Sequence, residues 1–166
     1  MLVRSTRTAA ALAVLLGLLA ALLVLRSSVS AQDPGPRTLT LRETERGGTF
    51  AHIRNTKGAS QRSNRAGDVI VFTNPIVDAA GKRIGKTSVS CVTTTGARNF
   101  MRSAMTCHGV TELPDGSLTM QAIVAPNAPT TIGAVTGGTG AYANARGVFS
   151  SSEGESGSQT TITLVD

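Results

Sequence analysis

The sequence predicts an all-β domain behind an N-terminal export signal, and three observations support that class. From residue 38 onward, short segments rich in Val, Ile, Thr and Phe alternate with Gly, Pro, Asn and Asp. None of these segments repeats apolar residues with the period near 3.6 that marks an amphipathic helix. Several place Ser and Thr opposite Val, Ile and Met, as in a sheet with one wet face. Eight or so such strands indicate a sandwich or a barrel.

The first 31 residues are set apart from that domain. Arg4 and Arg7 precede an unbroken apolar run, Ala9–Leu25, and the small residues before Gln32 suit a signal peptidase. We expect a signal helix over 1–31, cleaved after Ala31. The alternative is an uncleaved membrane anchor, because the run is just short of the ~20 residues of a usual span. In both cases the domain faces outward, either secreted or attached to the membrane.

The first half of the domain, which we place at 38–166, follows a Pro- and Gly-rich linker at 32–37. Thr38–Glu45 alternates, with Leu39 and Leu41 on one face, and a Gly-Gly pair ends it. The next elements are a short strand at 49–54, a polar loop at 56–66 and the strongest strand signal, GDVIVFTNPIV, at 67–77.

The second half continues in the same way. A long β-branched strand is expected at 83–95, and a turn at 96–99 separates it from a strand at 100–113. Pro114–Gly116 is a tight-turn signal. The remaining strands are expected at 117–125, 130–136, 146–150 and 160–165, with 151–158 as a Ser-, Gly- and Glu-rich loop.

A glycine cluster, GAVTGGTGAYANARG, lies at Gly133–Gly147. A phosphate-binding loop would need a Lys after the glycines and a helix behind them. This stretch contains no Lys, and the VFSSS that follows predicts a strand. We interpret the cluster as a corner before a late strand, where glycine supplies backbone angles that other residues resist.

Charge and composition exclude nucleic acid as the expected partner. The full chain carries +6, and +3 without the three arginines of the leader, which is a mild charge. The chain has no Trp, one Tyr and four Phe, so it lacks the stacking platforms of single-strand binders.

Cys91 and Cys107 are the only cysteines. In an exported chain such a pair predicts a disulfide. If the hairpin is centred near Asn99, the two residues face each other across antiparallel strands, within reach of a disulfide. A reactive thiol or a metal site is the alternative. We expect no metal, because Cys107 and His108 are adjacent and point to opposite faces of a strand.

Several of these segments resemble one superfamily. GGTGAYANARG is similar to the late motif of the dirigent proteins and to its counterpart in the allene oxide cyclases. GDVIVFTN, followed by KRIGKTSVSC, looks like the central segment of allene oxide cyclases, and FTNPIVD resembles a dirigent segment. GSLTMQA matches the cyclase strand that precedes an active-site aromatic residue. The resemblance covers about residues 67–150. It implies an eight-stranded antiparallel β-barrel and a homotrimer.

The family's reactive residues do not fall on matching side chains here. In the cyclases an acid on the first strand and a later Tyr act on an epoxide. Alignment places Thr40 at the acid, with Glu43 and Glu45 nearby, and Val124 at the tyrosine.

The dirigent pattern also departs from this sequence. Its paired aspartates fall on Thr73 and Asn74, and its inward arginine falls on Ala143.

Three polar residues remain as candidates for catalysis: Asp68, Asn74 and Arg146. Asp68 could act as a base at the barrel mouth or cap backbone N–H groups in a turn. Arg146 could hold an anionic group or pair with an acid such as Asp68.

Phe72, Cys91 and Tyr142 are the candidate ligand contacts. We expect an exported barrel that binds a small apolar molecule and steers its cyclisation or coupling. This isomerase-like role would need neither metal nor organic cofactor. The alternative is a secreted or envelope-associated binding barrel without chemistry. A thiol nucleophile at Cys91 would require that Cys91 is not in a disulfide.

Overall fold

The computed structural model describes residues 36–55, 63–155 and 157–165. These residues form nine strands and two short 3-10 helices. Their bounds are β1 (Arg37–Glu43), β2 (Thr49–Ile53), β3 (Val69–Val77), β4 (Arg83–Thr95), η1 (Phe100–Arg102), β5 (Ala104–Leu113), β6 (Gly116–Val124), β7 (Thr130–Gly138), η2 (Gly140–Tyr142), β8 (Arg146–Gly154) and β9 (Gly157–Val165). The predicted signal helix and most of the linker lie outside the described residues, and so does most of the predicted loop at 56–66. No helix in the described part is long and apolar enough to cross a membrane.

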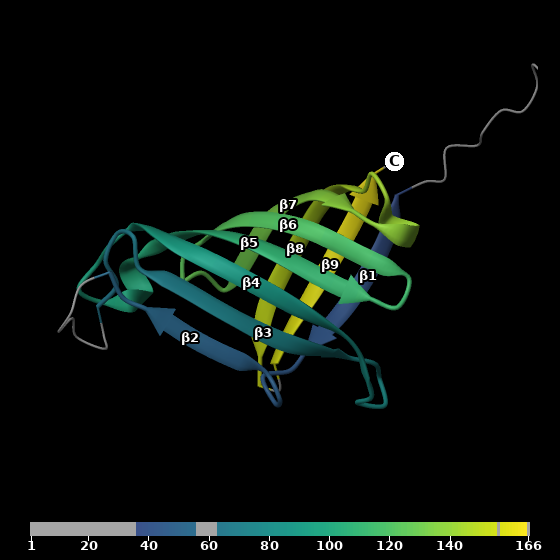
Figure 1. The fold of residues 1–166 in the computed structure, drawn as a ribbon, viewed down its shortest axis with the longest axis horizontal. Helices are drawn as coiled ribbons and strands as arrows, with labels where there is room; N and C mark the ends of the chain where they lie inside the picture. The colour runs from purple at the N-terminus through teal and green to yellow at the C-terminus, as the bar shows by residue number, and fades with distance from the viewer. Residues whose placement is uncertain (1–35, 56–62, 156, 166) are drawn as a thin grey trace, which may run out of the picture. The chain divides into compact units, whose positions relative to one another are not determined.

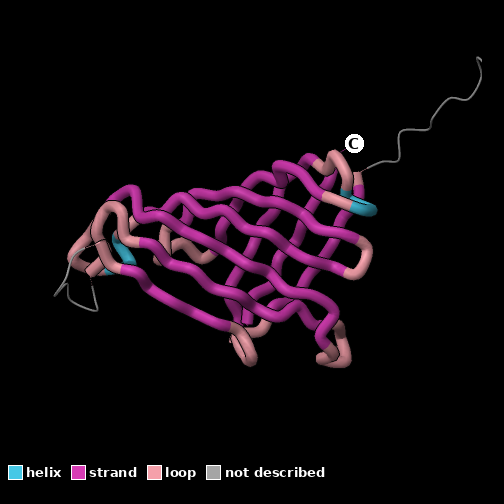
Figure 2. Tube along the Cα trace, viewed as in Figure 1, coloured by secondary structure: helices cyan, strands magenta, loops and turns pink. Residues whose placement is uncertain are grey.

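Eight of the strands close into an antiparallel barrel (Figures 1 and 2). The strand order is β1-β9-β8-β7-β6-β5-β4-β3, and a short pairing of β1 with β3 completes the ring, with Glu43 opposite Ile76. β2 is additional to the ring and pairs with the first half of β3, from Ile53 opposite Val69 to Thr49 opposite Thr73. The predicted eight-stranded barrel is therefore confirmed, and the short strand expected at 49–54 forms β2, which lies outside the ring.

The period of two in the sequence decides which side chains enter the barrel. In β1, Leu41 and Glu43 are buried while Arg42 between them is exposed. The same alternation in the other strands builds two buried clusters. One contains Leu41, Ile76, Leu118, Met120, Val135, Tyr142, Ile162 and Leu164. The other contains Ile70, Cys91, Met105 and Cys107.

The hairpin of β4 and β5 carries the disulfide that the sequence predicts. Cys91 pairs directly with Cys107 in the ladder, with their Cα atoms 4.0 Å apart, and the two sulfurs are bonded. The register agrees with the expected one, although the connection is longer than a four-residue turn and contains η1. Because both thiols are bonded, neither is available as a nucleophile.

The predicted loop at 151–158 is wrong. Strand β8 continues to Gly154 and β9 begins at Gly157, so the two form one tight hairpin. Ser, Gly and Glu have low strand propensity, but pairing along the whole of β8 and β9 overrides it.

The glycine cluster forms the expected corner, although its first part lies in β7 rather than in the turn. Gly138 ends β7 where a Cβ would meet the side chain of Tyr142 and the carbonyl oxygen of Ser117. Gly140 then adopts a φ of +60° at the start of η2. The corner thus brings Tyr142 into the first buried cluster.

Candidate functional site

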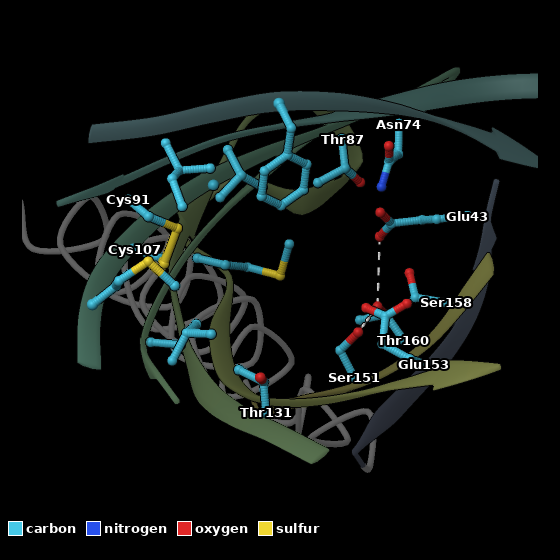
Figure 3. Close-up of a pocket in the computed structure, with 18 of the residues that line it drawn as sticks. Glu43, Asn74, Thr87, Cys91, Cys107, Thr131, Ser151, Glu153, Ser158 and Thr160 are labelled. Atoms are coloured by element: carbon cyan, nitrogen blue, oxygen red, sulfur yellow. Dashed lines mark hydrogen bonds between the residues drawn. A yellow bond between two sulfur atoms is a disulfide. The ribbon is translucent and has the colours of Figure 1, made fainter. Parts of the chain in front are cut away.

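A cavity of about 320 Å³ lies inside the barrel (Figure 3). Most of its wall is apolar, and the Cys91–Cys107 disulfide forms part of it. The volume lies at the lower end of the ~300–1,000 Å³ typical of small-molecule sites. The apolar side chains of the wall include Ile70, Phe72, Val89, Met105, Met120, Val124 and Phe149.

One region of the cavity is polar and is centred on Glu43. In Figure 3, Asn74 and Thr87 lie on one side of its carboxyl group and Thr160 on the other. Thr160 Oγ1 donates to Glu43 Oε1 over 3.5 Å, and Asn74 and Thr87 are also hydrogen-bonded to the carboxyl group. Ser151 Oγ lies 2.9 Å from the oxygen of the same Thr160 hydroxyl group. The carboxyl group is therefore held from three strands, β3, β4 and β9.

Burial raises the pKa of Glu43 above its ordinary value of 4.5. Desolvation is the largest cause, because only 8% of the residue is exposed. The nearby carboxylate of Glu153 raises the pKa further, while the hydrogen bonds from Thr87, Asn74 and Thr160 oppose the shift. A carboxyl group with this property can exchange a proton with a bound molecule nearer to neutral pH than an exposed one.

Glu43 was not among the residues selected from the sequence, although a signal for it was present. Leu39, Leu41 and Glu43 are spaced by two, so an extended strand puts all three on the same face. The resemblance instead placed Thr40 at the position of the acid. Thr40 is exposed, because on a strand it points to the face opposite that of Leu39 and Leu41, away from the barrel interior.

A second, polar cavity of about 220 Å³ adjoins the first at this point. Glu43, Glu153 and Ser158 line both cavities. Glu43 therefore lies between the apolar interior and a polar space near the β8–β9 hairpin.

Three of the six sequence-selected residues line the interior cavity, namely Phe72, Asn74 and Cys91. Asp68 does not. It is fully buried at the start of β3, where its two carboxylate oxygens accept backbone N–H groups of Asn55 and Arg65 at 2.8 and 2.9 Å. The hydrogen bond from Asn55, with that from Arg65, keeps the pKa of Asp68 below its ordinary value of 3.8. This is the turn-capping arrangement that the sequence left open.

Tyr142 and Arg146 also lie outside the lining of the interior cavity. Tyr142 packs in the first buried cluster, with the Arg37 guanidinium 5.1 Å from its ring centre. Arg146 is exposed and its Nη1 donates to the carbonyl oxygen of Thr136 at 3.3 Å. Asp68 and Arg146 thus lie outside the interior cavity that Asn74 lines, and the catalytic roles of all three stay predictions.

The described residues thus form a barrel of the type that can hold a small molecule, closed and antiparallel, with a mostly apolar cavity and a buried acid. Comparison with protein families identifies the family. Residues 49–161 match the family described as allene oxide cyclase barrel like domain, so the chain belongs to that family. A comparison with curated proteins finds no match.

Solved structures with the same fold share little sequence with this chain. A pyocyanin demethylase is 22% identical, with a TM-score of 0.63, over 78% of this chain and 100% of the other. A pterocarpan synthase dirigent protein is 15% identical, with a TM-score of 0.60, over 81% and 86%. A nonspecific heme-binding cyclase of neoabyssomicin biosynthesis is 15% identical, with a TM-score of 0.58, over 86% and 69%. These likenesses establish the fold.

Proposed function

We propose that the barrel binds a small, mostly apolar molecule in its interior and promotes its isomerisation or cyclisation through Glu43. The observation that carries this proposal is the buried carboxyl group, with its raised pKa, at the polar end of an apolar cavity. The similar structures include a pyocyanin demethylase, a cyclase that catalyses a [4 + 2] cycloaddition and a pterocarpan synthase dirigent protein, which supports a role in small-molecule chemistry.

In this proposal the wall orients the ligand and Glu43 moves a proton. The protonated carboxyl group gives its proton to one atom of the ligand, and the carboxylate takes a proton from another, so the mass of the ligand is unchanged. Asn74, Thr87 and Thr160 hold the carboxyl group in place for both steps. Exclusion of water by the apolar wall strengthens each of these interactions.

Ligands carried through a native purification provide the test. We expect the wild-type chain to retain a small molecule that mass spectrometry identifies, and to convert it to a product of the same mass but different retention time. Glu43→Gln should lose the conversion even when the ligand is added at a concentration that saturates the variant. Glu45→Gln removes an exposed carboxyl group from the same stretch and is the matched control.

Two outcomes would contradict the proposal. Conversion by Glu43→Gln at the wild-type rate would remove the acid from the mechanism. Binding without any conversion by the wild-type chain would instead support the second function, a binding barrel without chemistry.

We also propose that the chain is exported and that its barrels associate as trimers. The Cys91–Cys107 disulfide supports an oxidising compartment. Ile123 and Ile132 on the outer face are 74% and 69% exposed, and a second barrel packed against them would cover this apolar surface. Detection of the mature chain, beginning after Ala31, in the extracellular fraction would support export, whereas a cytoplasmic chain with two free thiols would refute it.

A further inference from the structure

All four phenylalanines of the chain line the interior cavity. They come from four separate elements, with Phe50 in β2, Phe72 in β3, Phe100 in η1 and Phe149 in β8. Only 3% of the chain is aromatic, so their convergence on one cavity is not a consequence of abundance. Phe50 is 70% exposed, and it lies opposite Phe72 in the β2–β3 ladder. A ligand in this cavity would therefore contact several aromatic rings.

The charged groups of the cavity are all of one sign. Glu43 and Glu153 line it, whereas no Lys, Arg or His among the described residues does. A ligand carboxylate or phosphate would lose its hydration here without gaining a cationic partner, which is costly. A positively charged ligand would gain attraction from both carboxyl groups and from the faces of the aromatic rings.

We propose that the ligand of this cavity is a compact organic cation, such as an N-alkylated or protonated nitrogen heteroaromatic. Its ring framework lies among the phenylalanines, and its positive nitrogen lies toward Glu43 and Glu153. This inference rests on the proposed function, because it takes the barrel interior as the ligand site. The cavity of about 320 Å³ limits the ligand to roughly two or three fused rings.

Three two-ring probes of nearly equal size test the charge preference. N-methylquinolinium is cationic, 2-methylnaphthalene is neutral and 2-naphthoate is anionic. We expect calorimetric titration of the full chain to give the cation about tenfold tighter binding than the neutral probe, and no measurable binding of the anion. Equal or tighter binding of the neutral or anionic probe would overturn the inference while leaving the barrel interior as the ligand site.

Substitutions of cavity residues then show where the probes bind. Glu153→Gln should weaken binding of the cation several-fold and leave the neutral probe unaffected, whereas the exposed Glu45→Gln should change neither. Ala122 lines the cavity, so Ala122→Leu should fill part of the cavity and weaken the binding of both probes. If no probe binds, or if Ala122→Leu has no effect on binding, the interior is not the site. The proposed function would then fail together with the inference.

Proton release gives an independent readout of where the cation lies. A positive charge beside Glu43 stabilises its carboxylate, so binding of N-methylquinolinium should release protons, whereas binding of 2-methylnaphthalene should not. Titration in two buffers of different ionisation enthalpy measures this release. Equal proton release by the two probes, or none by the cation, would contradict placement of the cation beside Glu43.

Discussion

The hydroxyl group of Thr160 donates a hydrogen bond to the carboxyl group of Glu43, although 117 residues separate them in the chain. The contact exists because β1 pairs with β9, which brings the first and last strands of the barrel together. β1 also pairs with β3 at Glu43 itself. Strand β1, whose pairings close the barrel, therefore carries Glu43. The two strands that flank β1 both contribute a hydrogen bond to the Glu43 carboxyl group.

The raised pKa of Glu43 predicts how stability depends on pH. Because the pKa is higher in the folded than in the unfolded chain, the stability contributed by this group is full below about pH 4.5 and is lost as pH rises through the folded pKa. Glu43→Gln cannot ionise. Its free energy of unfolding, relative to wild type, should therefore increase with pH, and a gain of 1 kcal/mol would raise Tm by roughly 2–8 °C.

Urea unfolding of both proteins from about pH 4 to about pH 8 measures this difference. Glu45→Gln controls for the loss of an exposed carboxyl group. A difference between wild type and Glu43→Gln that stays constant with pH would show that the pKa of Glu43 is the same in the folded and the unfolded chain.

Asp68 should behave in the opposite way. Its pKa is lowered in the folded chain, so its contribution is present above about pH 3.8 and is lost as pH falls through the folded pKa. Asp68→Asn should lower Tm by several degrees at neutral pH, with a smaller effect in acid, because Asn55 and Arg65 lose a charged acceptor. Ligand affinity and turnover should be unchanged. A folded Asp68→Asn protein without turnover would restore the catalytic role expected from the sequence.

Much of the barrel could be predicted because its information is local. The period of two locates the strands, and the spacing of Cys91 and Cys107 about the hairpin gave the correct pairing. The 151–158 segment could not be predicted in this way. Its strands exist because β8 and β9 pair with each other and with β7 and β1, which composition alone does not reveal.

The site was harder to predict than the fold because it depends on strands that are distant in sequence. Asn74, expected as a catalytic residue, and Phe72, expected as a ligand contact, both line the cavity and lie in the most clearly patterned strand, although their roles stay predictions. Asp68 is an even number of residues from Phe72 and Asn74, so the alternation of the strand predicts the same face for it. It lies at the start of β3, however, and its carboxylate accepts hydrogen bonds from the loop backbone. Glu43 lies outside the motifs that resemble the family, so the sequence does not single it out. Its spacing of two from Leu41 nevertheless puts its side chain on the inner face of the barrel.

Removal of the disulfide should cost about 3 kcal/mol of unfolding free energy, because it closes a loop of 16 residues in sequence separation. The double variant Cys91→Ala with Cys107→Ala isolates this effect, since a single substitution would leave a buried thiol in the cavity wall. Urea unfolding with and without reductant measures it. Wild type under reducing conditions should approach the double variant, and an unchanged midpoint in both would contradict the predicted stabilisation.

The proposed trimer depends on the exposed apolar surface of β6 and β7. Ile123→Glu combined with Ile132→Glu should convert the assembly to single chains, because association would bury carboxylates without partners. Light scattering after size-exclusion chromatography gives the mass. Ile84→Glu, at a less exposed position in β4, controls for the added charge. A wild-type protein that elutes as a single chain at micromolar concentration would refute the trimer.

Two glycines of the same cluster should respond differently to alanine. A Cβ at Gly133 would overlap the ring of Phe149 and the carbonyl oxygen of Gln121, whereas at Gly137 its nearest neighbour is Thr119 Oγ1 at 3.2 Å. Gly133→Ala should therefore destabilise the barrel by roughly 1–3 kcal/mol, because a packed wall must move. Gly137→Ala should cost less, since a side chain can adjust.

Phe149 lines the interior cavity, so Gly133→Ala should also weaken ligand binding by displacing that ring. Urea unfolding and titration with the aromatic probes measure the two effects on the same samples. If Gly133→Ala and Gly137→Ala prove equally stable and bind the probes equally well, Phe149 does not need the space that Gly133 leaves.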